Sequence, residues 1–103
     1  MPIFMIERNY AEKLEVTPEG AEAINRINDE ESIRWLVSFL SVDKRKTFCL
    51  YEASSSEAIR EAARRAGLPA DSIIEVSNEV SPNGQVNPLQ TQRYVEGWSS
   101  QGK

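Results

Sequence analysis

The sequence predicts an α+β domain whose elements follow the order β-α-β-β-α-β. Four segments rich in β-branched and aromatic residues are expected to be strands, at 2–10, 32–42, 47–53 and 72–80. Two segments with helical spacing and capping residues stand between them, at 17–31 and 54–67. With right-handed crossovers, this order gives a four-stranded antiparallel sheet with two helices on one face, the ferredoxin-like arrangement.

The first strand, Pro2 to Tyr10, is apolar on both of its faces. Ile3 and Met5 point one way, and Phe4 and Ile6 point the other. We therefore expect both faces of the sheet to be covered.

The first helix follows a polar connection at 11–16. Thr17 is the expected N-cap, and Pro18 suits the first helical position because its missing N–H has no partner to lose there. Ala21 and Ile24 follow helical spacing and predict one narrow buried stripe. The helix is expected to end near 29–31.

A hairpin is predicted from 32 to 53. Both arms are rich in apolar, β-branched and aromatic residues, and the polar turn Asp43 to Lys46 joins them. The second helix then begins at one of three serines, Ser54 to Ser56, and ends at Gly67 because Pro69 prevents its continuation.

The chain is expected to divide into a ferredoxin-like domain at 1–80 and a C-terminal arm or tail at 81–103. Loop residues such as Pro82 and Gly84 mark the change of character. Two interpretations of the tail stay open. It is either loose, or an arm from Leu89 to Trp98 that covers a partner subunit or a pocket mouth.

The composition limits the classes of binding partner that we expect. The net charge is −4, which argues against nucleic acid. No apolar run approaches the roughly 18 residues of a membrane span, and residues 1–10 show no secretory signal. The single cysteine, Cys49, fits a reducing cytosol.

Because two helices cover only one face of a sheet that is apolar on both, a homodimer is the expected assembly. Irregular alternation of the apolar residues is the other interpretation.

Three residues are candidate metal ligands: Glu7, Cys49 and Glu52. Glu7 and Glu52 end the first and third strands, which we predict to be parallel neighbours, so the two carboxylates are placed close together. They form either a functional pair or ion pairs with Arg8 or Arg34. Cys49 lies in mid-strand, where a free cysteine usually behaves as a small apolar residue.

A ligand pocket is the second hypothesis. An aromatic set with a few polar groups suits a small organic molecule, although core or dimer packing explains the same residues. The candidate pocket residues are Glu7, Trp35, Ser38, Phe39 and Tyr51.

Several segments together carry a resemblance to a known family. They are Ile6 to Arg8, Arg34 to Phe39, Asp43 to Ala53, Glu57 to Asp71 and Ile73 to Val76. Across 2–80 the chain resembles the small bacterial family called domain of unknown function 4242, also described as nickel-binding-protein-like. The resemblance implies a dimeric ferredoxin-like domain and a link to nickel. Relatives often carry histidine where this chain has Val37, and this chain has no histidine at all. Nickel favours imidazole or thiolate ligands. The lack of histidine therefore argues against assigning the nickel binding of the relatives to this chain.

Two functions from different classes remain. The first is a homodimeric binding or structural protein that holds a metal ion or small ligand at the sheet face. The alternative is a small enzyme, by analogy with dimeric ferredoxin-like monooxygenases and isomerases whose pocket lies beside the sheet. No catalytic residue is assigned, because the sequence contains no nucleophile triad, phosphate-binding loop or CxxC motif.

Overall fold

The computed structural model describes residues 1–94. Its elements are β1 (Ile3–Asn9), α1 (Pro18–Glu30), β2 (Arg34–Leu40), β3 (Lys46–Glu52), α2 (Ser56–Ala66), β4 (Ser72–Val76), β5 (Asn78–Val80) and β6 (Val86–Pro88). The order β-α-β-β-α-β of the first six elements confirms the fold class expected from the sequence.

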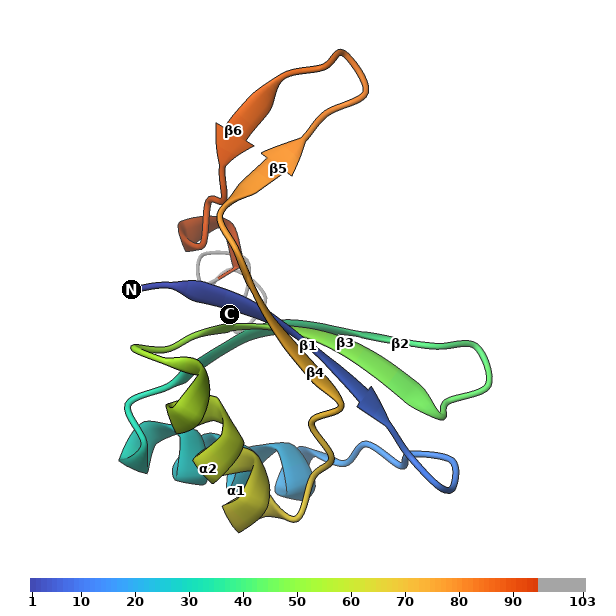
Figure 1. Cartoon of the computed structure of the whole chain (residues 1–103). Helices are drawn as coiled ribbons and strands as arrows, with labels where there is room; N and C mark the ends of the chain where they lie inside the picture. Colours follow the sequence, from blue (N-terminus) through green and yellow to red (C-terminus); the bar gives the residue numbers. More distant parts are fainter. Residues whose placement is uncertain (95–103) are drawn as a thin grey trace.

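The main sheet has the strand order β2-β3-β1-β4. The two helices lie together on one face of it (Figure 1). The first and third strands are central, as predicted. The expectation that they are parallel is wrong, since β1 pairs antiparallel with both β3 and β4. Only antiparallel neighbours result from this topology, because the β1-α1-β2 crossover leaves room between its strands for β3.

The pairing of β1 with β3 assigns side chains to two faces. Phe4 lies opposite Tyr51, and Ile6 lies opposite Cys49; this side is here called the helix face. The other side, the open face, carries Glu7 opposite Phe48. The alternation follows the pleat of the strands.

A β-bulge at Leu36 interrupts β2. The register shifts between Trp35 and Val37, so Trp35 lies opposite Tyr51 while Ser38 lies opposite Cys49. One extra residue in a strand changes which side chains share a face. Trp35 and Ser38, three positions apart, are thereby both on the helix face.

The core fills the space between the helix face and the two helices. Ile6 and Ile59 are its largest fully buried side chains, at 0% and 1% exposure. The other buried members of this cluster are Phe4, Ile33, Cys49, Tyr51, Ala53 and Ala62. Burial of apolar side chains from both layers is what holds the helices on the sheet.

Both helices begin and end at the residues that the sequence indicates. The Thr17 hydroxyl accepts a hydrogen bond from the Gly20 N–H at 3.0 Å. Ser55, one of the three candidate serines, caps α2 by accepting from the Ala58 N–H at 3.2 Å. Gly67 closes α2 with φ at 69°, in the left-handed region that glycine tolerates.

The fourth predicted strand, 72–80, is two strands in the structure. β4 ends at Val76, and β5 pairs with β6 in a separate hairpin that projects from the sheet (Figure 1). The boundary expected after residue 80 therefore falls inside this hairpin. Its tip holds the loop residues Pro82 and Gly84, which explains why composition changes there.

The expected arm is described only in part. Residues 92–94 form a helical turn, while Val95 to Trp98 fall outside the part of the chain that the structure describes. Within residues 1–94, no helix has the length and apolar character needed to cross a membrane.

The open face keeps large apolar side chains in contact with solvent. Phe39, Phe48 and Ile74 are 56%, 40% and 59% exposed. Phe39 and Phe48 lie directly opposite each other on neighbouring strands. This face is the counterpart of the helix face, where the same strands are covered.

Candidate functional site

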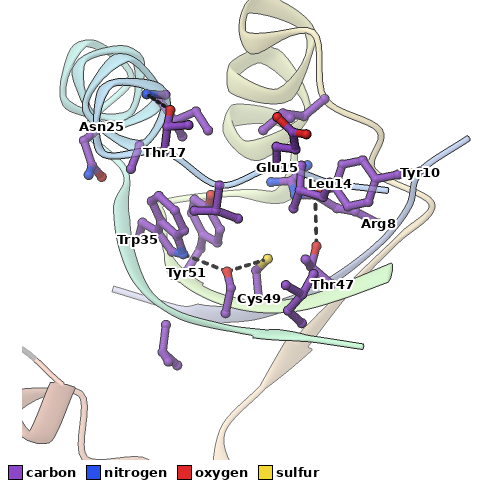
Figure 2. A pocket seen from close by; sticks show the side chains of 18 of the residues that line it. Arg8, Tyr10, Leu14, Glu15, Thr17, Asn25, Trp35, Thr47, Cys49 and Tyr51 are labelled. Carbon is purple, nitrogen blue, oxygen red and sulfur yellow. Dashed lines mark hydrogen bonds between the residues drawn. The ribbon is translucent and has the colours of Figure 1, made fainter. Parts of the chain in front are cut away.

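A pocket of about 490 Å³ opens on the helix face, between the sheet, the N-terminal half of α1 and the connection from Tyr10 to Thr17 (Figure 2). The helices do not cover the sheet completely, and β2 and β3 extend beyond the packed core at this end. The residues that define its shape include Tyr10, Leu14, Ile24, Trp35, Thr47 and Tyr51.

The connection that forms one wall is fixed to the turn between β2 and β3. The Tyr10 N–H donates to the Arg45 carbonyl at 2.8 Å, and the Leu14 N–H donates to the Lys44 carbonyl at 2.7 Å. The Arg45 guanidinium also donates to the carbonyl of Ala11. These backbone contacts hold a segment without regular secondary structure in a defined position.

Two aromatic rings form the floor. Trp35 and Tyr51 are parallel, with an interplanar angle of 5° and ring centroids 6.3 Å apart. The Trp35 indole N–H donates to the Ser38 hydroxyl at 2.8 Å, and Ser38 donates to the Cys49 sulfur at 2.7 Å. This chain of bonds fixes the orientation of the indole ring, as Figure 2 shows.

Further hydroxyl groups on the sheet side are paired with each other. The Tyr10 hydroxyl and the Thr47 hydroxyl are 3.2 Å apart, and either atom donates. Thr47 is only 4% exposed. The pair links the wall to β3, opposite the end at which Trp35 lies.

Arg8 lines the pocket where it adjoins a small void, a place called here the inner end, and is only 3% exposed. One of its N–H groups donates to the Pro69 carbonyl at 2.6 Å. Its guanidinium carbon is 5.7 Å from the centre of the Tyr51 ring. Among residues 1–94, no carboxylate forms an ion pair with it. A buried positive charge without a counter-ion is unusual, because burying a charge is costly.

Tyr51 is a neutral phenol at physiological pH. Burial raises the pKa of the Tyr51 hydroxyl above its ordinary value, while the nearby Arg8 charge lowers it by a smaller amount. The side chain is 4% exposed and belongs to the core cluster. Tyr51 therefore provides an apolar ring and an uncharged hydroxyl to the site.

Asn28, on α1, lies behind the pocket floor. Its amide nitrogen is buried and has no hydrogen-bond partner in the described chain. It borders a small void of about 10 Å³ that Arg8 and Tyr51 also line. The void has room for about one water molecule. An unpartnered amide nitrogen, a buried guanidinium and the Tyr51 hydroxyl therefore gather at the inner end of the pocket.

The structure brings three of the five candidate pocket residues together: Trp35, Ser38 and Tyr51 all line the pocket. Glu7 and Phe39 do not, because both lie on the open face. The alternation of β2 had placed Trp35 and Phe39 on one side. The bulge at Leu36 reverses this relation and puts Ser38 beside Trp35 instead.

The three candidate metal ligands do not meet. Glu52 lies opposite Ile3, four residues from Glu7 on an antiparallel strand, which separates the carboxylates by roughly 13 Å. Glu7 forms an ion pair with Lys46 at 3.2 Å, where Arg8 or Arg34 was expected, and Glu52 pairs with Arg34 at 3.3 Å as one interpretation held. Cys49 is on the other face of the sheet.

The same geometry decides whether these side chains can bind nickel. Within residues 1–94, no three histidine, cysteine, aspartate or glutamate side chains gather closely enough to hold a metal ion. Cys49, the softest donor in the chain, is buried and accepts a hydrogen bond from Ser38. The residues that the structure describes therefore do not fit a nickel site.

Two features of the site escaped the sequence analysis. Arg8 follows Phe4 and Ile6 at two-residue spacing, so the alternation that predicted a buried face also pointed to a buried arginine. The wall from Tyr10 to Thr17 gave no such signal, since the hydrogen bonds that hold it are made largely by its backbone groups, to a turn distant in the sequence.

Comparisons with known proteins agree with the fold. The model of the nickel-responsive SCO4226-like protein family matches residues 4–76. The crystal structure of SCO4226 from Streptomyces coelicolor A3(2) superposes with a TM-score of 0.61 at 24% identity, covering 72% of this chain and 94% of that one. At this identity the likeness supports the fold alone. A comparison with curated protein sequences found no match.

Proposed function

Because the chain belongs to the family of nickel-responsive SCO4226-like proteins, we propose that it is a small binding module within that family. Its site is the pocket on the helix face, and its ligand is a small organic molecule that is held without turnover. The assignment to domain of unknown function 4242 and the cytosolic location expected from Cys49 stay predictions.

The pocket itself carries this proposal. Its volume of about 490 Å³ lies within the roughly 300–1,000 Å³ that is typical of small-molecule sites. Its floor is aromatic, and the orientation of Trp35 is fixed by hydrogen bonds before any ligand arrives. A preformed apolar site loses little conformational freedom on binding, which favours affinity.

Nickel is not the ligand that we assign to this chain. The family name describes a response to nickel, and such a response does not require every member to coordinate the ion. The residues described here offer no cluster of three donor side chains. A metal with nitrogen or sulfur preference has no suitable site among them.

We also propose that the chain forms a homodimer through the open face. The support is the exposure of Phe39, Phe48 and Ile74 on one side of the same sheet. A surface of this kind is typical of protein interfaces. A second copy is the occupant we propose, because a chain of 103 residues has a small core of its own and gains stability by sharing one.

A small enzyme is the alternative function. It is favoured by the polar groups that converge on the pocket. The positions of the carboxyl groups with a shifted pKa oppose it. An active site usually contains a carboxyl group whose pKa is perturbed. Hydrogen bonds lower the pKa of Asp43, through Ser41, and of Glu61, through Arg64, and both carboxyl groups lie on the surface outside the pocket.

The test fills the pocket with a side chain. Ala21 faces the pocket from α1, whereas Ala23 on the same helix is exposed and does not line it. Native mass spectrometry of the purified protein is expected to show a retained small molecule, or binding from a library of small organic compounds. Ala21→Trp should abolish binding and Ala23→Trp should preserve it. Equal binding by both variants would place the site elsewhere and reject the proposal.

A further inference from the structure

We infer that the ligand of the pocket is a small organic monoanion, a carboxylate with an apolar body, whose charged group is bound by Arg8. This inference rests on the function proposed above and names the class of molecule. Three observations support it: the charge of Arg8, which has no ion-pair partner in the described chain, the unpartnered amide nitrogen of Asn28 beside it, and the exposed position of Glu15, the one acidic residue among those that line the pocket.

The first observation is the environment of Arg8. The side chain is 3% exposed and has no ion-pair partner within the described chain. One N–H group is satisfied by the Pro69 carbonyl, and the Tyr51 ring faces the guanidinium. A carbonyl and a ring face stabilise the cation only in part, because neither carries a full negative charge. A bound carboxylate would neutralise it and accept two of its N–H groups.

The second observation is an unpartnered buried amide group at the same place. The Asn28 amide nitrogen has no acceptor, although Asn28 is only 3% exposed. It shares its small void with Arg8 and Tyr51. A water molecule in that void would accept from Asn28 and pass one hydrogen bond on toward the pocket. A ligand rich in acceptor oxygens would then match the Arg8 guanidinium directly and the Asn28 amide through that water.

The third observation concerns negative charge. Glu15 is the one acidic residue among those that line the pocket. It is exposed and belongs to the connection at the mouth of the pocket (Figure 2). Solvent screens an exposed carboxylate far more than a buried guanidinium, so its repulsion of an anion is weak compared with the attraction by Arg8.

The walls of the pocket indicate the chemistry of the uncharged part of the ligand. Apart from Arg8, the pocket is lined mainly by apolar and aromatic side chains, among them Leu14, Ile24, Trp35 and Leu36. A single guanidinium matches one negative charge, which favours a monocarboxylate over a doubly charged phosphate. A flat aromatic or branched aliphatic body completes the match with the apolar walls.

The experiment compares each carboxylate with its neutral carboxamide. Benzoate, naphthalene-2-carboxylate and octanoate are titrated into the wild-type chain by calorimetry, alongside the three corresponding amides. We expect at least one carboxylate to bind about tenfold or more tightly than its amide, since a hydrogen bond to a charged group contributes that much. Arg8→Met should remove this preference, and Arg8→Lys should retain part of it.

The outcomes separate this inference from the proposed function. If amides and carboxylates bind equally and Ala21→Trp abolishes both, the pocket is the site and the anion assignment is wrong. If no compound binds the wild type while native mass spectrometry still shows a retained molecule that Ala21→Trp excludes, the inference fails and the proposed function stands. The comparison within the wild type needs no variant, so a folding defect in Arg8→Met does not weaken it. Carboxylate binding that survives Ala21→Trp would also overturn the inference.

Discussion

The two faces of the sheet are built from the same strands but differ in what covers them. On the helix face, Ile6 and Cys49 are buried under two helices, and the uncovered end forms a pocket with fixed polar groups. On the open face, Phe39 and Phe48 lie side by side in contact with solvent. Neither helix reaches this side (Figure 1).

This difference separates two kinds of binding. A concave site with an unmatched buried charge suits a small ligand, whereas a broad apolar surface suits another protein chain. On β2, the bulge residue Leu36 decides which side chains lie on the helix face and which lie on the open face. Without the bulge at Leu36, Trp35 and Ser38 would not share the helix face. The functional surfaces therefore depend on a local irregularity as much as on the fold.

The largest expected contrast concerns stability. Ile6→Ala should lower the free energy of unfolding by about 2–5 kcal/mol, because a fully buried side chain leaves a cavity. At protein concentrations at which the chain is monomeric, Ile74→Ala, on the open face at 59% exposure, should cost about 1 kcal/mol or less. Urea unfolding of both variants provides the comparison. Equal losses would show that the open face is as well packed as the helix face.

The second prediction concerns assembly. A Phe39→Glu and Phe48→Glu double variant should sediment as a monomer where the wild type sediments as a dimer, because it buries two charges in the proposed interface. Val42→Glu is the matched control, since Val42 is fully exposed in the turn beyond β2. A wild type that is monomeric at all concentrations, or a double variant that remains dimeric, would contradict the interface.

The start of α2 offers a smaller effect on the helix face. Ser55→Ala removes the acceptor for the Ala58 N–H and should cost about 0.5–2 kcal/mol of stability. Ser54→Ala changes an exposed neighbour that makes no such bond and should be nearly neutral. Thermal unfolding of the two variants measures the difference. A loss of stability for Ser54→Ala as large as that for Ser55→Ala would contradict the assignment of Ser55 as the N-cap.

The smallest effect appears only in alkaline solution. Burial raises the pKa of Tyr51 above 10.0, so the unfolded chain ionises first as the pH rises. The contribution of the protonated Tyr51 hydroxyl to stability is fully present below its pKa in the unfolded chain. It is lost as the pH rises through its pKa in the folded chain. Urea unfolding at about pH 9 and about pH 11 should therefore show a smaller loss for Tyr51→Phe than for the wild type.

Tyr94→Phe is the control for the tyrosine experiment, because it removes a phenol outside the core cluster. If Tyr51→Phe and the wild type lose equal stability, the Tyr51 hydroxyl is not buried in solution.

The sequence predicted much of the fold because its signals are local. Thr17, Pro18 and Gly67 fix helix ends through their own backbone preferences. The alternation of Phe4 and Ile6 identifies a buried face by the geometry of a strand alone. Each of these signals acts within a few residues and needs no knowledge of the partner strand.

The candidate site was less predictable because it depends on register and on distant contacts. The bulge at Leu36 is visible only once β2 is aligned with β3. The separation of Glu7 from Glu52 follows from the antiparallel direction of their strands. The break after Val76 likewise appears only when β5 is seen to pair with β6. None of these relations is encoded in the spacing of residues along one segment.

The central claim is that the pocket on the helix face is the ligand site. The most direct test is an amide and indole NMR spectrum recorded during titration with each of benzoate, naphthalene-2-carboxylate and octanoate. We expect the indole N–H of Trp35 and the amides of Ala21 and Ile24 to shift together in a saturable way. Shifts confined to Phe39, Phe48 and their neighbours on the open face, or no saturable shift at all, would contradict the claim.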